Sequence, residues 1–238
     1  LLQGSINSIY YNNGLFIGKK NEVYRYNEET ANFDLYYQLP NGSLDIFCMH
    51  IDKGYLWIGT TTNGVYRLNI DKKELEHPIR KGNIISFYRD SGGELWIGSW
   101  EEGLFHVKTD GKIENFKYDA KNPHSLSSNF VRACCEDNLG NIWIGTFNGL
   151  NRYNKSTGLF QNHTANDIQS DGLTHSSIWC IVKDNQGTLW LGTYFGGVNY
   201  FNPEYEIYTR YSYSSNEKQG LSNPVVGRTI EDKNGNLW

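Results

Sequence analysis

Residues 142–146 read Ile142-Trp143-Ile144-Gly145-Thr146, and close copies of this stretch return along the chain. The copies occupy residues 56–60, 95–99 and 189–193, a weaker one occupies residues 15–18, and residues 237–238 begin another. Their aromatic residue stands at positions 16, 57, 96, 143, 190 and 238. A repeat of roughly 40–50 residues that is rich in strand-forming residues is typical of β-propeller blades and not of helical solenoids.

Each repeat contains four strand-like segments. An apolar run such as 131–136 comes first, and a turn with Asp and Gly, such as 137–140, joins it to the Trp strand. Asp accepts hydrogen bonds within its own turn and Gly adopts positive φ, which is hairpin chemistry. A third strand such as 150–154 and a more variable fourth strand complete the unit.

We therefore predict an all-β fold, a β-propeller of four-stranded antiparallel blades with five blades and the start of a sixth. The sequence stops in the middle of a repeat, so we expect residues 1–238 to be one domain that is part of a longer, seven-bladed propeller. The approximate blades are 5–40, 44–80, 83–118, 129–165, 176–215 and, in part, 224–238. The Trp residues are expected to pack between blades.

Composition limits the kinds of partner. With 22 basic and 26 acidic residues spread along the chain, there is no basic arm or stripe, so nucleic acid is not expected to bind. No apolar run reaches the roughly 20 residues of a membrane span. The four cysteines lack metal-ligand spacing and are predicted to be buried free thiols, and no cofactor or metal is expected.

The repeat resembles a known family. Asp-x-x-Gly-Asn-Ile-Trp-Ile-Gly-Thr followed by Gly-Leu-x-Arg-Tyr-Asn, in residues 137–154, resembles the two-component regulator propeller repeat, as do residues 184–202 and the stretch 124–129. The resemblance implies the periplasmic sensor region of a hybrid histidine kinase/response regulator of Bacteroidetes. It also implies a homodimer tethered to the inner membrane through other segments, a kinase elsewhere in the full-length protein, and an oligosaccharide ligand.

Aromatic residues recur where the loops between the second and third strands should gather. Trp100, Phe147 and Tyr194 occupy the same loop position in the third, fourth and fifth blades, where the second blade has Thr61. Aromatic rings stack on the flat C–H faces of sugars, and neighbouring polar groups bind the hydroxyls. Glu101, Asn148 and Phe195 are the next residues in these three loops.

The first strands add two unusual side chains. Arg132 and Trp179 occupy equivalent positions in adjacent repeats, at the end of the strand that is expected to lie near the loop mouth. The predicted ligand-binding residues are Trp100, Glu101, Arg132, Phe147, Asn148, Trp179, Tyr194 and Phe195. The alternative for the aromatic members is that they cover blade tops as part of the core.

Two other functions stay open. A glycosidase or lyase would need two carboxyl groups roughly 5–10 Å apart. The Asp of each turn is repeated and therefore structural, so the candidates are Glu101, Glu102, Asp167 and Asp171. His163 and His175 are expected on long loops without metal-ligand spacing. A protein-interaction propeller is the second alternative, because the same face can bind peptides.

Overall fold

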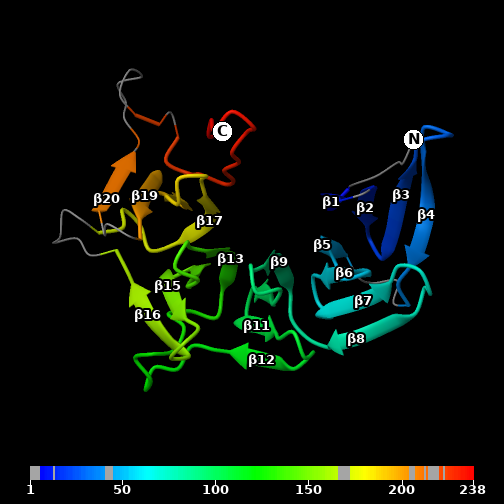
Figure 1. Ribbon diagram of the computed structural model, residues 1–238, viewed down its shortest axis with the longest axis horizontal. Helices are drawn as coiled ribbons and strands as arrows, with labels where there is room; N and C mark the ends of the chain where they lie inside the picture. The colour runs from blue at the N-terminus through cyan, green and yellow to red at the C-terminus, as the bar shows by residue number, and fades with distance from the viewer. Residues whose placement is uncertain are drawn as a thin grey trace. The chain divides into compact units, whose positions relative to one another are not determined.

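The computed structural model describes residues 6–12, 14–40, 45–165, 172–203, 207–211, 213, 220–221 and 223–238. Over these residues the chain forms β-strands and no helix (Figure 1). The strands make five four-stranded sheets in which hydrogen-bonded neighbours follow chain order and run antiparallel. This confirms the predicted fold class, a β-propeller of four-stranded antiparallel blades.

Each sheet is one blade. The first contains β1 (Ser8–Tyr11), β2 (Leu15–Lys19), β3 (Glu22–Asn27) and β4 (Asn32–Gln38), and the second contains β5 (Ile46–Asp52), β6 (Tyr55–Thr60), β7 (Val65–Asn69) and β8 (Leu75–Ile79). The third contains β9 (Ile84–Arg89), β10 (Leu95–Ser99), β11 (Leu104–Val107) and β12 (Ile113–Phe116). The fourth contains β13 (Val131–Glu136), β14 (Ile142–Thr146), β15 (Gly149–Asn154) and β16 (Leu159–His163). The fifth contains β17 (Ile178–Lys183), β18 (Leu189–Thr193), β19 (Val198–Asn202) and β20 (Ile207–Tyr211).

A sixth blade begins near the last residue. Glu231 and Leu237 form an isolated antiparallel bridge across the turn that starts at Asp232. The chain forms two compact units, Leu1–Phe87 and Tyr88–Trp238. That the whole chain is one domain, and that it is part of a seven-bladed ring, stay predictions.

A hydrogen bond explains the fixed spacing between the turn Asp and the Trp. The Trp143 Nε1–H donates to Asp137 Oδ2 at 2.7 Å, while Asp137 Oδ1 accepts the backbone N–H groups of Leu139 and Asn141. The same Trp–Asp bond joins Trp96 to Asp90, Trp190 to Asp184 and Trp238 to Asp232. The repeated Asp therefore belongs to the turn, as predicted, and it also holds the Trp of the next strand.

The second blade departs from this pattern. Its turn is one residue shorter, so Trp57 follows Asp52 by five positions instead of six. The Trp57 Nε1 is buried without a hydrogen-bond partner among the described residues. The guanidinium carbon of Arg67 lies 5.2 Å from the Trp57 ring centroid instead. A single-residue change in turn length thus removes the bond.

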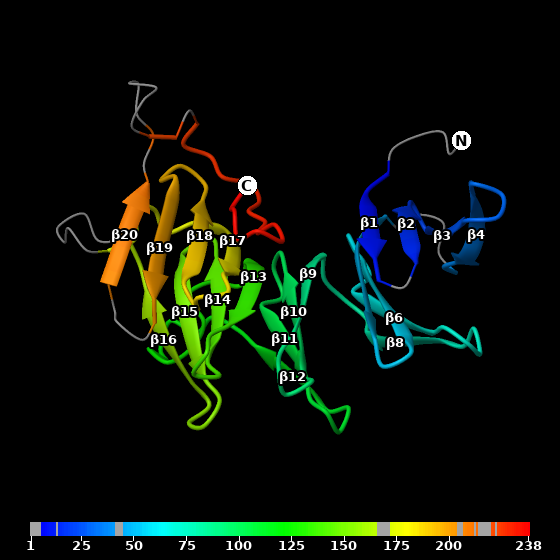
Figure 2. The ribbon, with the colours of Figure 1, turned by 45° about the horizontal axis from the view of Figure 1, so that its top comes forward.

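Apolar side chains fill the space between the fourth and fifth blades, whose inner strands β13 and β17 lie side by side (Figure 2). Trp143, Ile178, Leu189 and Phe201 are buried in one cluster, with the Trp143 and Phe201 ring centroids 4.8 Å apart. The prediction that Trp packs between blades is confirmed here. Gly145 keeps this contact close, because a Cβ added there would lie 2.7 Å from Ile178 Cγ2.

The cysteines are free, as predicted. Cys134 and Cys135 are buried, whereas Cys48 and Cys180 are half-buried. Burial raises the pKa of Cys135 to about 11. Burial also raises the pKa of Cys48 and Cys134, so these three thiols are protonated at neutral pH and are poor metal ligands or nucleophiles.

Candidate functional site

A β-bulge sets the direction of the two unusual inner-strand side chains. In the fourth blade Val131 pairs with Thr146 and Ala133 with Gly145, which leaves Arg132 as the extra residue. In the fifth blade Ile178 pairs with Thr193 and Cys180 with Gly192, which leaves Trp179 in the same position. A bulge interrupts the ladder and redirects the side chain of the extra residue. Arg132 and Trp179 therefore occupy equivalent places at the start of β13 and β17.

Backbone hydrogen bonds bring each loop aromatic beside its bulge. The N–H of Phe147 donates to the carbonyl of Phe130 at 3.0 Å, and the N–H of Tyr194 donates to the carbonyl of Ser177 at 3.0 Å. In both blades the accepting carbonyl belongs to the second residue before the bulge residue. The loop after the Trp strand is thus fixed against the beginning of the inner strand.

Arg132 lies among rings from three consecutive blades. Its guanidinium carbon is 4.1 Å from the Trp179 ring centroid, 5.1 Å from that of Trp100 and 5.6 Å from that of Phe147. These distances are within the range of about 6 Å for cation–π attraction. The Nη1 of Arg132 also donates to Ser177 Oγ at 3.1 Å. The contacts connect the third, fourth and fifth blades at one point.

Further rings extend this group on both sides. The rings of Trp179 and Tyr194 stack at 5.4 Å with an interplanar angle of 12°. Tyr194 meets Phe195 edge-on at 4.2 Å. On the other side, the ring centroid of Phe130 lies 5.5 Å from that of Trp100 and 5.9 Å from that of Phe147. We call the set Trp100, Phe130, Arg132, Phe147, Trp179, Tyr194 and Phe195 the Arg132 cluster.

The Arg132 cluster combines half-buried and exposed members. Trp100, Arg132, Trp179 and Tyr194 are half-buried. Phe147 and Phe195 keep 53% and 56% of their surface exposed. Two polar groups inside the cluster have no hydrogen-bond partner among the described residues, the Nε of Arg132 and the Nε1 of Trp179. The cluster therefore presents exposed ring surface and contains two buried donors without a partner.

The structure brings together all of the predicted site residues except Glu101 and Asn148. These two side chains are exposed, and neither makes a hydrogen bond to the cluster within the described part of the chain. Sequence reasoning missed Phe130 and Ser177, which precede the inner strands by one residue each. Their signal was weak because the blade connections differ in length between repeats.

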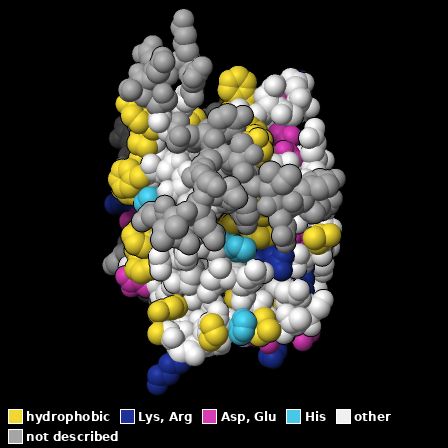
Figure 3. Space-filling model, turned by 90° about the vertical axis from the view of Figure 1, so that its left-hand side faces the viewer, with side chains coloured by type: hydrophobic (Ala, Val, Ile, Leu, Met, Phe, Trp, Pro, Cys, Tyr) yellow, Lys and Arg dark blue, Asp and Glu magenta, His cyan; other side chains and the backbone are white. Residues whose placement is uncertain are grey.

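The face on the side of β16 and β20 has no concentration of charge among its described side chains (Figure 3). Figure 3 shows the face on the side of β16 and β20, where the described Lys, Arg, Asp and Glu side chains are scattered. Among the described side chains of this face there is no patch of a single charge sign that would mark another ligand site (Figure 3).

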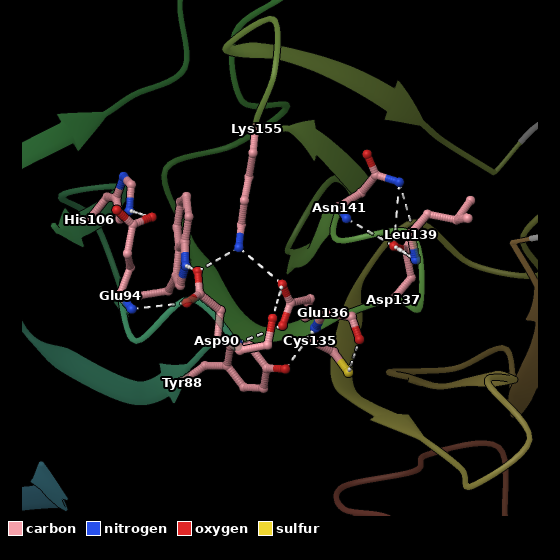
Figure 4. Close-up of polar contacts among 12 residues, drawn as sticks. Tyr88, Asp90, Glu94, His106, Cys135, Glu136, Asp137, Leu139, Asn141 and Lys155 are labelled. Carbon is pink, nitrogen blue, oxygen red and sulfur yellow. Dashed lines mark hydrogen bonds and ion pairs between the residues drawn. The ribbon is translucent and has the colours of Figure 1, made fainter. Parts of the chain in front are cut away.

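A second polar group, drawn in Figure 4, joins the third and fourth blades. Lys155 Nζ lies 2.8 Å from Asp90 Oδ2 and 3.0 Å from Glu136 Oε1. Burial alone would raise the pKa of each carboxyl group, but the bonds from Lys155 and from nearby N–H groups hold both pKa values below their usual range. Each carboxylate has several partners in the structure, including Trp96 for Asp90 and Ser91 for Glu136. This group is a structural link between blades.

The acids considered for an enzyme do not form a pair among the described residues. Glu102 bonds Lys117 at 2.8 Å, and Glu101 is exposed. Asp167 and Asp171 lie outside the described residues. Within the ranges that the structure describes, no group of three His, Cys, Asp or Glu side chains could hold a metal ion.

The expected loop position of His163 was wrong. His163 is the last residue of β16, and its ring lies 5.6 Å from that of Trp143. The residue belongs to the fourth strand because the strand pairs with β15 up to Leu150. His175 does lie in the connection before β17, where its Nδ1 accepts the backbone N–H of Ser177.

A family model described as two component regulator propeller matches residues 78–101, 125–148 and 172–195. Trp100, Phe147 and Tyr194 each stand next to last in a matched segment. No curated protein matches the chain. None of the described residues lies in a helix long and apolar enough to cross a membrane.

Several solved structures share the fold. The extracellular domain of a hybrid two component system of B. thetaiotaomicron matches with a TM-score of 0.74 at 23% identity, over 98% of this chain and 31% of that one. The extracellular domain of another such system from this organism gives 0.50 at 17% identity, over 100% of this chain and 39% of that one.

A surface component of the type-IX secretion system of Porphyromonas gingivalis, PorZ, gives a TM-score of 0.72 at 12% identity, over 98% of this chain and 37% of that one. The chain thus spans less than half the length of these proteins. Its three matched segments each end in a loop that carries one of the predicted site aromatics. The chain is a β-propeller that contains two-component regulator propeller repeats.

Proposed function

We propose that this chain is a ligand-sensing propeller from the periplasmic region of a hybrid two-component system, and that it binds oligosaccharides at the Arg132 cluster. The observation that carries the proposal is the convergence of Trp100, Phe147 and Trp179 on one guanidinium. These rings come from three consecutive blades. Trp100 and Phe147 follow the second strand of their blades and Trp179 lies at the start of the first strand, which is the same end of a blade because the two strands are antiparallel.

The chemistry of the cluster suits a sugar chain. A pyranose ring has apolar C–H faces that stack on aromatic rings and hydroxyls that need polar partners. Phe147 and Phe195 present exposed ring surface beside half-buried Trp100, Trp179 and Tyr194. Glu101 and Asn148 are exposed in the same loops and are available for hydroxyl contacts. Several rings side by side favour an oligosaccharide over a monosaccharide.

The family and the neighbours support the sensor context. The matched repeats and the extracellular domains of the similar structures favour a region outside the cytoplasm. In the proposed protein, membrane tether, dimer contacts and kinase belong to other segments. Binding controls such a kinase only when the ligand has different affinities for two arrangements of the sensor.

The test is a thermal-shift screen of the purified protein against neutral and acidic oligosaccharides from plants, animals and microbes, with product analysis on each sample. Ligand at about 100 times its Kd stabilises the folded state by about 2.7 kcal/mol, which a shift in Tm detects. We expect one glycan family to stabilise the protein and to be recovered intact. Cleaved glycan would contradict the proposal in favour of an enzyme, and no shift with any glycan would favour a protein-interaction propeller.

A further inference from the structure

Arg132 has more donors than partners. A guanidinium carries five N–H groups and no acceptor. Within the described part of the chain its hydrogen bond runs from Nη1 to Ser177 Oγ, and its Nε is buried without a partner. The rings of Trp100, Phe147 and Trp179 attract the charge but accept no in-plane N–H bond. A ligand group with several oxygen acceptors, such as a planar carboxylate, would accept hydrogen bonds from the remaining N–H groups of Arg132.

Several other cations that pack against the fold have a carboxylate partner, although Arg152, whose guanidinium carbon lies 6.0 Å from the Trp143 ring centroid, has none among the described residues. Lys155 lies between Asp90 and Glu136, and Lys117 bonds Glu102. Arg67, which also lies over rings, bonds Glu76. Arg132 makes no such ion pair among the described residues. Burial lowers the pKa of Arg132, with no neighbouring carboxylate to offset the cost of desolvating its charge.

We infer that the glycan bound at the Arg132 cluster is acidic, and that its carboxylate or sulfate group binds the Arg132 guanidinium while its sugar rings stack on the neighbouring aromatics. This inference rests on the proposed function and names the class of ligand for the same site. The planar fork of a guanidinium matches carboxylate and sulfate-like oxygens in a bidentate way, which hydroxyls of a neutral sugar do not reproduce. Arg132 is half-buried, so part of its surface stays accessible to an anion.

The overall charge of the chain does not favour anions. The whole chain has a net charge of −4 and its basic residues are dispersed. Long-range attraction therefore does not bring an acidic ligand to the cluster, and recognition of the acid falls on Arg132. Removal of this one charge should then abolish the preference for acidic ligands.

The experiment uses pairs of tetrasaccharides that differ only in charge. Galacturonate, glucuronate and mannuronate oligomers are each compared with their carboxyl-reduced forms, and a sulfated galactan oligomer with its desulfated form. Isothermal titration calorimetry is carried out on the wild-type protein and on Arg132→Met and Arg132→Lys. The uronate and sulfate pairs distinguish the two sources of negative charge.

We expect at least one acidic oligomer to bind the wild type about 10- to 100-fold more tightly than its neutral form, as for a charge-assisted hydrogen bond. Arg132→Met should reduce that difference to less than about threefold, and Arg132→Lys should restore part of it. Equal binding of both members of every pair would overturn the inference and leave the proposed function intact. Binding of no oligomer of either kind would contradict the proposed function itself.

A purely structural role for Arg132 predicts another result. If the arginine only holds the rings in place, Arg132→Met lowers the affinity for acidic and for neutral oligomers by the same factor, and the inference is wrong. Circular dichroism and Tm of both variants show whether they are folded. If Arg132→Met is unfolded, the comparison of paired oligomers on the wild type still decides whether the ligand must be acidic.

Discussion

The guanidinium carbon of Arg132 lies 4.1 Å from the ring centroid of Trp179, a residue of the next blade. Both are the extra residues of β-bulges at the start of inner strands, in β13 and in β17. Two bulges in equivalent places thus turn side chains of neighbouring blades toward each other. The same bulge in β5 makes Phe47 the extra residue of the second blade, which provides a natural control.

Replacement of Trp179 by Ala should reduce affinity for the bound glycan by about 10-fold or more. Trp179 stacks on Tyr194 and contacts Arg132, so its loss removes a ring face and disturbs both neighbours. Stacking contacts of large aromatic residues are worth about 0.5–1.5 kcal/mol beyond the area that they bury. Isothermal titration calorimetry measures the change in Kd.

Phe47→Ala is the matched control for this experiment. It removes an aromatic ring from the same bulge position in another blade, and Phe47 is 44% exposed. Glycan affinity should stay within about twofold of the wild type. An equal loss in both variants would show that the bulge aromatics act on the fold and not on the ligand.

The repeat makes the central part of the site predictable. Equivalent positions in successive blades have the same backbone, so Trp100, Phe147 and Tyr194 can be aligned by their place in the repeat. Arg132 and Trp179 differ in side-chain type from the residues at the same inner-strand position in most other blades, which indicates that this position has a function in the fourth and fifth blades. The bulge that directs them has no sequence signal of its own, because it depends on the register with the neighbouring strand.

Other features cannot be read from the sequence. Phe130 and Ser177 lie in connections of unequal length, where repeats cannot be aligned by position. The Asp–Trp hydrogen bond requires the three-dimensional form of the turn, although its spacing of six residues is visible in the sequence. The repeat pattern predicts a loop at His163, wrongly, because the fourth strands vary most between repeats and their ends have no consistent pattern.

Lys155→Met should lower the free energy of unfolding by about 2–3 kcal/mol. The substitution leaves Asp90 and Glu136, whose side chains are 0% and 8% exposed, without their shared cation. The expected loss is below the roughly 3–5 kcal/mol of a fully buried pair because Lys155 is partly exposed. Chemical denaturation measures the change. Lys121→Met, at an exposed position, is the control and should be neutral.

The same group predicts how stability depends on pH. The folded-state pKa values of Asp90 and Glu136 are lowered, so their contribution is fully present above the unfolded pKa values near 4 and is lost as the pH falls below them. The difference in Tm between the wild type and Lys155→Met should therefore be largest at pH 6–8 and should shrink toward about pH 3. If the Tm difference between the two proteins stayed constant over this pH range, the ionisation of Asp90 and Glu136 would not contribute to the effect of Lys155.

Trp143→Phe should destabilise the protein by about 1.5–3 kcal/mol more than Trp57→Phe does, because only the first removes a hydrogen bond to a charged group. Trp143 Nε1 donates to Asp137, whereas the Nε1 of Trp57 has no partner among the described residues. Both substitutions remove a similar volume from a buried site. Chemical denaturation of the two variants gives the difference. Equal losses would mean that the Asp–Trp bond adds nothing to stability beyond packing.

Gly145→Ala should lower the free energy of unfolding by about 1–3 kcal/mol, the usual cost of overpacking. The added methyl group would lie 2.7 Å from Ile178 Cγ2 and force β14 away from β17. If that contact is the cause, Gly145→Ala should cost less in an Ile178→Ala background, where the methyl has room. Gly227→Ala is the control, since a Cβ there meets nothing within 4 Å. A cost of Gly145→Ala that is unchanged by Ile178→Ala would place the strain within the fourth blade and not between the blades.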